Sequence, residues 1–398
     1  MAAKPTHERS IDLLEGDFYV NDPYPTYAWM RENAPAYWDP VNELWGISRY
    51  DDVVEIEKNK ALFINGGQEA GGYRPNIPAD PAIIGLDDPH HSARRKLVSR
   101  RFTPKAVTSF EEHIRELVAS LFDEALGHGG PIDVVGDLAA PLPAEMIGAL
   151  LGFPREMTPK LQDWSERTIA LGGGPRYLND DGIAGAMEFA AASAELFEEK
   201  SKCPADDVMS IWTTAEVPGH DFGLDEVISD CLLLLDGGAE TTRTVIARSM
   251  LELAAGPDQW ALLKDGADLE VATEEFIRWV TPIHNMCRST VEDCEVAGQQ
   301  IAAGEQLVLM YPAANRDPAH FQDPENLDVT RHPNHHIAFG FGTHFCLGSS
   351  LARLEIRLFL EELLSRVDSL SVVEGSVQEM PNAFVYGLRS ARMELTPA

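Results

Sequence analysis

The sequence of 398 residues lacks the features that direct a protein out of the cytoplasm. Its five cysteines are odd in number and include no Cys-x-x-Cys pair, which argues against a disulfide framework. We find no stretch of about eighteen apolar residues, so we expect no membrane-spanning segment. Residues 1–10 are polar where a secretion signal would be apolar. We therefore predict a cytoplasmic protein in reducing surroundings.

Positive charge is also scarce. The chain has 32 lysines and arginines against 64 aspartates and glutamates, a net charge of −32. Such a surface repels nucleic acid and anionic membranes, so we expect neither as a partner. No repeat, low-complexity tract or linker divides the chain. We expect one domain over residues 1–398, large enough to bury a substantial core, and a monomer.

Helical periodicity dominates the sequence, above all over residues 108–200. A strand is expected at 44–47 with a helix over 51–60, and strand-like alternation returns over 298–311. Residues 64–86 are rich in glycine and proline and predict a long loop, which in compact proteins is usually functional or mobile. The pattern predicts a mainly α fold with a small β region (α+β).

One long helix, about 45 Å at the standard rise, is expected over residues 224–254. Its first half is apolar on most sides, which indicates burial. Gly237 and Gly238 each cost about 1 kcal/mol within a helix, and a buried Glu240 is costly unless it is paired or protonated. The glycines would let another group lie flat against the backbone and let the hydrogen-bond ladder open. Glu240 and Thr241 would then supply a proton source and a hydroxyl beside that group.

A single cysteine, Cys346, stands among glycines and aromatic residues over 339–348, directly before another helical pattern. The glycines allow the backbone to approach a flat ligand closely. N–H groups at the start of the following helix would stabilise a thiolate at this sulfur. A thiolate held against a planar group is what haem iron ligation needs. For an isolated Cys-x-Gly, a structural cysteine in a turn would be the simpler interpretation.

The complete run resembles the cysteine-ligand loop of the cytochrome P450 superfamily, whose pattern is Phe-x-x-Gly-x-His-x-Cys-x-Gly. Three more segments are similar to the superfamily, in its order: an Asp-x-Pro-x-His-x-x-x-Arg element, an oxygen-activation motif and a Glu-x-x-Arg motif. On these four segments the chain is identified as a member of the superfamily, with haem between the long helix and the cysteine loop. The matching residues are Phe339, Gly342, His344, Cys346 and Gly348; His91 and Arg95; Gly237, Gly238, Glu240 and Thr241; Glu275 and Arg278.

The resemblance implies a role for each group of residues. Cys346 would ligate the iron of haem b, and Phe339 would pack against the cysteine loop. Thr241 and Glu240 would deliver protons during oxygen activation, with Glu in place of the more common Asp. Arg331 would join Glu275 and Arg278 in a structural network. The implied haem-binding residues are His91, Arg95, Gly237, Gly238, Arg288, His336, Phe339, Gly340, His344 and Gly348.

The implied activity is hydroxylation of a C–H bond in an apolar small molecule. Residues at 72–75, 285–288 and 382–385 resemble bacterial enzymes that oxidise sterol side chains, which favours a steroid; a terpenoid or fatty acid is the alternative. A haem-thiolate protein that does not activate O2, and a haem-free protein with Cys346 in its core, are rival classes. The residues expected to line the substrate pocket are Leu234 and Val245 on the long helix, with Ile283, Asn285, Met286, Phe384 and Val385.

A basic segment suggests how electrons arrive. Between Pro89 and Phe110 there are six basic residues and no acid, in a strongly acidic chain. Such a patch would steer a small acidic partner, which we expect to be a ferredoxin reduced by a separate NAD(P)H-dependent reductase. An ordinary solvated basic helix is the alternative. The residues of the expected patch are Arg94, Lys96, Arg100, Arg101 and Lys105, with Arg353 and Arg357 beyond Cys346; Arg95 would face the haem.

Overall fold

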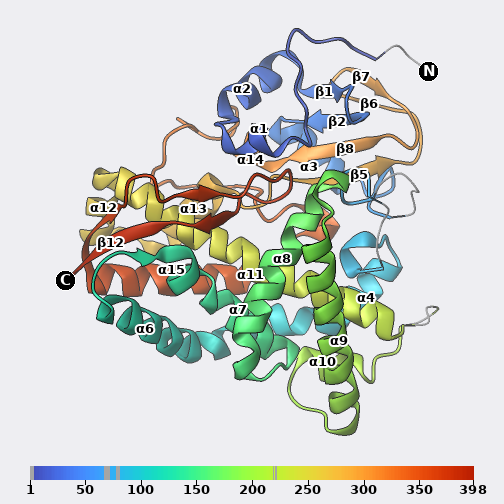
Figure 1. Cartoon of the computed structure of the whole chain (residues 1–398). Coiled ribbons are helices and arrows are strands. Elements are labelled where there is room, and N and C mark those ends of the chain that lie inside the picture. Colours follow the sequence, from blue (N-terminus) through green and yellow to red (C-terminus); the bar gives the residue numbers. More distant parts are fainter. Residues whose placement is uncertain (1–3, 67–71, 78–80, 218, 220–221) are drawn as a thin grey trace.

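The computed structural model describes residues 4–66, 72–77, 81–217, 219 and 222–398. Helices make up most of it, and the strands form two groups, one with β1, β2 and β8 near the N-terminus and one with β12 near the C-terminus (Figure 1). The principal helices are α1 (Gly16–Val20), α2 (Tyr24–Asn33), α3 (Tyr50–Lys58), α4 (His90–Val98), α5 (Pro104–Val107), α6 (Glu111–Gly127), α7 (Pro141–Leu151), α8 (Thr158–Thr168), α9 (Asp180–Lys202), α10 (Val208–Trp212), α11 (Leu224–Ala255), α12 (Pro257–Lys264), α13 (Leu269–Val280), α14 (Tyr311–Ala314) and α15 (Ser349–Arg366).

The largest sheet has the strand order β1-β2-β8-β5-β3. Only β2 and β8 run parallel within it, and the other pairs are antiparallel. A second sheet has the order β4-β12-β9, and two hairpins complete the β region, as the sequence predicted. The strands are β1 (Ala36–Asp39), β2 (Leu44–Ile47), β3 (Phe63–Ile64), β4 (Ile132–Asp133), β5 (Asn285–Thr290), β6 (Cys294–Val296), β7 (Gln299–Ile301), β8 (Gln306–Met310), β9 (Val367–Val372), β10 (Gln378–Glu379), β11 (Leu388–Ser390) and β12 (Arg392–Pro397).

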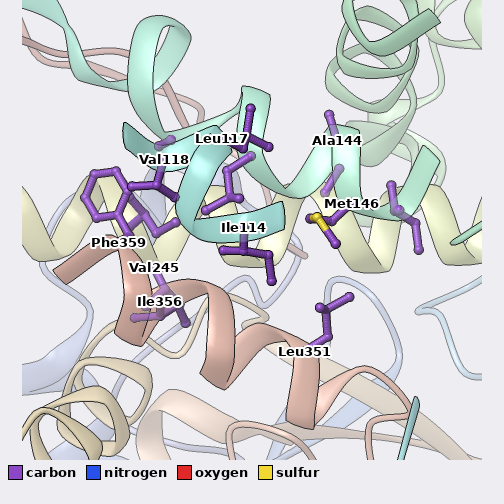
Figure 2. Close-up of a cluster of buried hydrophobic side chains, with 14 of the residues drawn as sticks. Ile114, Leu117, Val118, Ala144, Met146, Val245, Leu351, Ile356 and Phe359 are labelled. Carbon is purple, nitrogen blue, oxygen red and sulfur yellow. The ribbon is translucent and has the colours of Figure 1, made fainter. Parts of the chain in front are cut away.

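The core forms where α6, α7 and α15 pack around α11. Figure 2 shows Ile114 and Val118 of α6 close to Phe359 of α15, with Val245 of α11 beside them. Apolar residues three and four apart place one stripe of each helix in this cluster. Burying such side chains contributes about 1.5–3 kcal/mol each. The packing holds the start of α15, and with it the cysteine loop, against the long helix.

Two expectations about helices need correction. The long helix α11 is continuous through Gly237 and Gly238, so its backbone ladder does not open there. In addition, residues Val134–Leu151 are long and apolar enough to cross a membrane by length and composition, although the sequence analysis found no such stretch. Of this segment 78% is buried, as expected for a core helix of a globular fold. Asp137 and Glu145 interrupt the run, so it is not a continuous apolar stretch.

The other expected elements are found with small changes. The strand at 44–47 and the helix near 51–60 are β2 and α3. Residues 298–311 form two strands, β7 and β8, and Tyr311 already begins α14. Within the expected loop 64–86, the described residues contain the end of β3 and one turn of 3₁₀ helix at Ile83–Gly85. Residues 67–71 and 78–80 of that loop lie outside the described residues.

Candidate active site

A cavity of about 510 Å³ lies between α11 and the cysteine loop. Its walls come from α4, the segment 72–77, α8, α11, β5, the loop 338–348 and the start of α15. Most lining side chains are apolar, which is usual for a pocket that takes an organic ligand. The structure therefore brings together segments that are far apart in the sequence, from Glu57 to Phe384.

The loop before α15 presents Cys346 to this cavity. Gly340 and Gly342 adopt positive φ values of 69° and 70°, which favour glycine. A Cβ on Gly342 would lie 2.6 Å from the carbonyl oxygen of Glu57. The turn closes where the Cys346 N–H donates to the Phe339 carbonyl at 2.9 Å. Phe339, Gly340, Cys346 and Gly348 all line the cavity, as predicted.

The surroundings of the Cys346 sulfur act in opposite directions on its acidity. Burial raises the pKa of the Cys346 thiol. The N–H groups of Gly348 and Ser349 and the guanidinium groups of Arg95 and Arg353 lower this pKa. The helix-start N–H groups expected from the sequence are thus in place to stabilise a thiolate.

A cluster of cationic and imidazole groups lies in the cavity on the same side as the cysteine loop. The rings of His91 and His344 lie with their centroids 4.1 Å apart and their planes tilted by 43°, and Arg95 lies one turn after His91 on α4. Neither ring nitrogen of His91 makes a hydrogen bond within the described part of the chain, although the side chain is only 1% exposed. Buried nitrogens without partners are costly unless a ligand satisfies them. Together with the thiol, this donor set fits haem, whose propionates would satisfy the orphaned nitrogens.

Arg288 lines the same cavity but is held by a carboxylate that the sequence analysis missed. Its Nη2 lies 3.0 Å from Oε1 of Glu57, which also accepts a hydrogen bond from the Tyr311 hydroxyl at 2.8 Å. Burial raises the pKa of Glu57, while the charge of Arg288 lowers it. The guanidinium is therefore fixed in orientation before any ligand arrives. This arrangement keeps Arg288 among the candidate haem-binding residues.

His336 does not join that set. Its side chain is buried, and its Nε2 lies 3.1 Å from Oε2 of Glu274 rather than on the cavity wall. Glu274 also binds Arg353 at 2.6 Å, and the two partners lower the pKa of Glu274 to about 2 despite its burial. The match to a propionate-binding position was wrong for His336, because its ring faces α13 instead.

The α11 face predicted to cover the haem does line the cavity. Leu234, Gly237, Gly238, Thr241 and Val245 all contribute to the wall. Thr241 donates its hydroxyl hydrogen to the Gly237 carbonyl at 2.8 Å. A Cβ on Gly238 would lie only 3.1 Å from Ile147 of α7, so this glycine serves helix packing as well. Gly237 has open space where its Cβ would be, as a surface against a flat ligand requires.

Glu240 points the other way. It is 1% exposed, does not line the cavity, and forms an ion pair of 2.8 Å with Arg243. Ser165 of α8 donates a hydrogen bond of 3.2 Å to its second oxygen. Burial raises the pKa of Glu240, and Arg243 lowers it. The carboxyl group must leave Arg243 before it can reach the cavity, so its role in proton delivery stays a prediction.

Three of the five residues expected beyond α11 to line the substrate region do so: Ile283, Met286 and Phe384. Asn285 instead donates a hydrogen bond to the Ala383 carbonyl at 2.8 Å. Side chains alternate along a strand, so Met286 and Arg288 face the cavity while Asn285 faces away. Val385, which forms a β-bridge with Ile283, is fully buried and does not line the cavity.

The predicted network around Glu275 forms beside the site. Glu275 and Arg278 are both 0% exposed and are joined by two hydrogen bonds of 2.7 and 2.8 Å. Arg331 adds contacts of 3.1 and 3.2 Å to the same carboxylate, and Arg278 also donates to the Asn315 carbonyl. The network ties α13 to the segment that leads into the cysteine loop.

The expected basic patch is smaller than the sequence indicated. Arg94 is buried and pairs with Asp230 at 2.6 Å. Arg101 pairs with Asp206, Arg353 with Glu274, and Arg357 with Glu361, which neutralises all three. In the described part of the chain, the exposed cations of the segment that make no ion pair are Lys96, Arg100 and Lys105. The elements η2 (Ser99–Phe102) and α5, which carry two of them, contact α15 on the cysteine side.

The sequence analysis also missed polar residues in the cavity wall. Asp236 of α11 lines the cavity and lies 2.7 Å from the hydroxyl of Thr168 of α8. Arg74 lines the same wall, with its guanidinium 3.2 Å from the centroid of the Phe384 ring. One signal could have revealed Asp236: an acid directly after an unbroken run of four leucines is unusual in a buried helix.

Comparison with known proteins agrees with this geometry. The cytochrome P450 family model matches residues 260–394, which include Glu275, Arg278 and Cys346. A steroid C26-monooxygenase of Mycobacterium tuberculosis is 40% identical over 402 aligned residues, covering 99% of each chain. The chain belongs to the cytochrome P450 family. As a member, it is a monooxygenase that carries haem b on a cysteine thiolate and depends on redox partners for electrons.

Two solved structures extend the comparison. A Mycobacterium marinum cytochrome P450 in complex with pseudoionone is 30% identical, with a TM-score of 0.90, covering 99% of this chain and 100% of the other. A Bacillus megaterium cytochrome P450 in complex with testosterone is 31% identical, with a TM-score of 0.86, covering 95% and 98%. The predicted mainly α fold of this P450 is therefore confirmed.

Proposed function

We propose that this P450 hydroxylates the side chain of a steroid. The observation that carries the proposal is the 40% identity to a steroid C26-monooxygenase over nearly the whole of both chains. The cavity supports it, because its lining is mostly aliphatic and aromatic and lies directly above Cys346. Burying an apolar substrate there is favourable by about 25 cal/mol per Å².

Within this activity the residues divide the work. Haem supplies the oxidising chemistry, and Cys346 holds its iron as a thiolate that donates electron density. Leu234, Val245 and Met286 pack against the substrate and exclude water. Thr241 directs a proton toward the reacting oxygen. The Glu240 carboxyl group, once it has separated from Arg243, supplies the next proton to Thr241. His91 and Arg95 hold the propionates.

A ligand titration tests the substrate class. Cholest-4-en-3-one, the terpenoid ketone pseudoionone and palmitic acid are titrated separately into the purified holoenzyme, and the Soret band is followed for the low-spin to high-spin shift. The proposal requires the steroid to produce the largest shift at the lowest concentration. Tighter binding of the terpenoid or the fatty acid would assign the enzyme to that class instead.

We further propose that electrons come from an acidic ferredoxin, reduced by a separate NAD(P)H-dependent reductase, and that it docks on Lys96, Arg100 and Lys105. These cations are exposed in a chain of net charge −32, and Arg100 and Lys105 lie on elements that contact α15. Replacing all three with glutamate should slow ferredoxin-driven reduction at low salt while leaving dithionite reduction unchanged. The control variant is Arg389→Glu, which reverses the charge of an exposed cation on β11 outside this patch. Equal rates in both variants would remove the patch as the docking site.

We also propose that the enzyme is a cytoplasmic monomer with a single domain. All five cysteines are free, which suits the reducing cytoplasm. The large negative charge makes identical copies repel one another, which supports a monomer. Near-complete coverage of the relatives supports a single P450 domain over residues 1–398.

A further inference from the structure

The cavity wall contains a polar corner that the monooxygenase chemistry does not use. Asp236 projects from α11, Thr168 from the end of α8 and Arg74 from the segment 72–77, and all three line the cavity. The rest of the wall around them is apolar, including Leu233, Ile169 and Phe384. A carboxyl group among such neighbours costs stability that a leucine would not. A chain that keeps it there gains something other than stability.

The contacts of Thr168 show what this corner can offer. The hydroxyl lies 2.7 Å from the Trp164 carbonyl and 2.7 Å from Oδ1 of Asp236. A hydroxyl has one hydrogen to donate, and a carbonyl can only accept. Thr168 therefore donates its hydrogen either to Oδ1 of Asp236 or to the Trp164 carbonyl, and in the second case Asp236 must carry a proton to donate to Thr168. Burial raises the pKa of Asp236 to about 8, while the Thr168 hydrogen bond and the Arg74 charge act to lower it.

A neutral carboxyl group both donates and accepts hydrogen bonds. With one oxygen engaged by Thr168, its remaining hydrogen-bonding capacity faces the cavity. The Arg74 guanidinium adds donors on the same wall. Gly172 keeps this wall compact, since a Cβ there would lie 2.8 Å from Phe384 and 3.1 Å from Arg74. The ligand group that satisfies both a donor and an acceptor is a hydroxyl.

We propose that Asp236, supported by Thr168 and Arg74, is a specificity-determining subsite that binds a hydroxyl group on the substrate. The position of Asp236 on α11 determines which part of the substrate must carry the hydroxyl group. Asp236 precedes Thr241 by five residues, which is about 7.5 Å along the helix axis. If the oxidised carbon lies beside Thr241, the hydroxyl is about five to six carbon–carbon bonds away. On a steroid oxidised at the end of its side chain, that is the junction of the side chain with the ring system.

The inference rests on the proposed steroid activity, and matched sterols separate the two. Cholesterol, 20-hydroxycholesterol and 7-hydroxycholesterol are titrated into the holoenzyme, with binding followed by the spin-state shift and by calorimetry. The two hydroxysterols have the same composition and differ in where the second hydroxyl lies. The subsite requires the 20-hydroxy compound to bind about 5- to 10-fold more tightly than the 7-hydroxy compound, the effect of one well-placed hydrogen bond.

Three variants identify the residue responsible. Asp236→Leu should abolish the preference for the 20-hydroxy sterol and strengthen cholesterol binding, while Asp236→Asn should keep part of the preference. Thr168→Val tests the purely structural alternative, in which the Thr168–Asp236 bond only joins α8 to α11. That alternative requires Asp236→Leu and Thr168→Val to weaken binding of all three sterols equally.

The outcomes are distinct. No preference in the wild type, or a preference that Asp236→Leu leaves intact, overturns the subsite while the steroid activity stands. Failure of every sterol to bind overturns the proposed activity, and the subsite on a steroid falls with it. Calorimetry reports binding independently of turnover, so a variant with poor activity still gives an answer.

Discussion

Replacing Glu275 with glutamine should destabilise this P450 strongly, because the structure concentrates two buried cations on its carboxylate. Glu275 accepts hydrogen bonds from Arg278 at 2.7 and 2.8 Å, from Arg331 at 3.1 and 3.2 Å, and from Asn334 at 3.0 Å. It also accepts one from the backbone N–H of Asp328 at 2.9 Å. Glutamine keeps the shape but removes the charge and turns one acceptor into a donor.

The expected loss in the free energy of unfolding depends on which acceptors Arg278 retains in the variant. Removing one partner of a buried ion pair costs about 3–5 kcal/mol, since the other charge is left uncompensated. Arg278 retains carbonyl acceptors at Asn315 and Pro324, which offset part of that cost. We therefore expect the free energy of unfolding to fall by about 3 kcal/mol. The haem Soret band should also shift as the segment before the cysteine loop loosens.

Urea denaturation of the holoenzyme, followed by circular dichroism, measures the effect. Glu361→Gln is the matched control, because Glu361 also contacts two arginines, Arg115 and Arg357, but at the partly exposed surface. Such surface pairs contribute about 0–1 kcal/mol. A loss below 1 kcal/mol for Glu275→Gln, equal to that of the control, would refute the claim that burial makes this network strong.

Three further predictions address the site. Cys346→Ser should lose the strongly red-shifted Soret band of the reduced carbon monoxide complex, and persistence of that band would show that another residue ligates the iron. Thr241→Ala should retain haem and substrate binding but divert reducing equivalents to hydrogen peroxide, measured as product per NAD(P)H consumed; full coupling would contradict the role assigned to Thr241. Asp236→Asn should change how stability depends on pH. The folded-state pKa of Asp236 is raised from 3.8 to about 8, so wild-type stability falls as pH rises through that window. Relative to the wild type, the variant should gain about 2 kcal/mol between pH 4 and 8, less than the full shift at 1.36 kcal/mol per unit because the cavity is partly solvated. A difference between variant and wild type that stays constant with pH would argue against a raised pKa at Asp236.

Local patterns sufficed for the parts of this P450 that depend on short-range rules. Helical periodicity located α11 within one residue of its end, and the pattern after Cys346 predicted the helix that forms there as α15. The side chains that were misplaced depend on long-range partners. His336 faces Glu274, and Arg94 is buried against Asp230, and neither partner is near in the sequence. Strand register, which a sequence pattern sets only loosely, turned Asn285 away from the cavity.

Helix α8 is joined to α11 by two side-chain bonds, Thr168 to Asp236 and Ser165 to Glu240. Both α11 partners are acids, one on the cavity wall and the other beside Arg243. Glu166 of α8 also lies 3.8 Å from Arg243, so the same helix contacts both members of the Glu240–Arg243 pair. A displacement of α8 away from α11 would lengthen all three contacts. Substrate entry that displaced α8 would in this way couple the loading of the pocket to the mobility of the Glu240 carboxyl group.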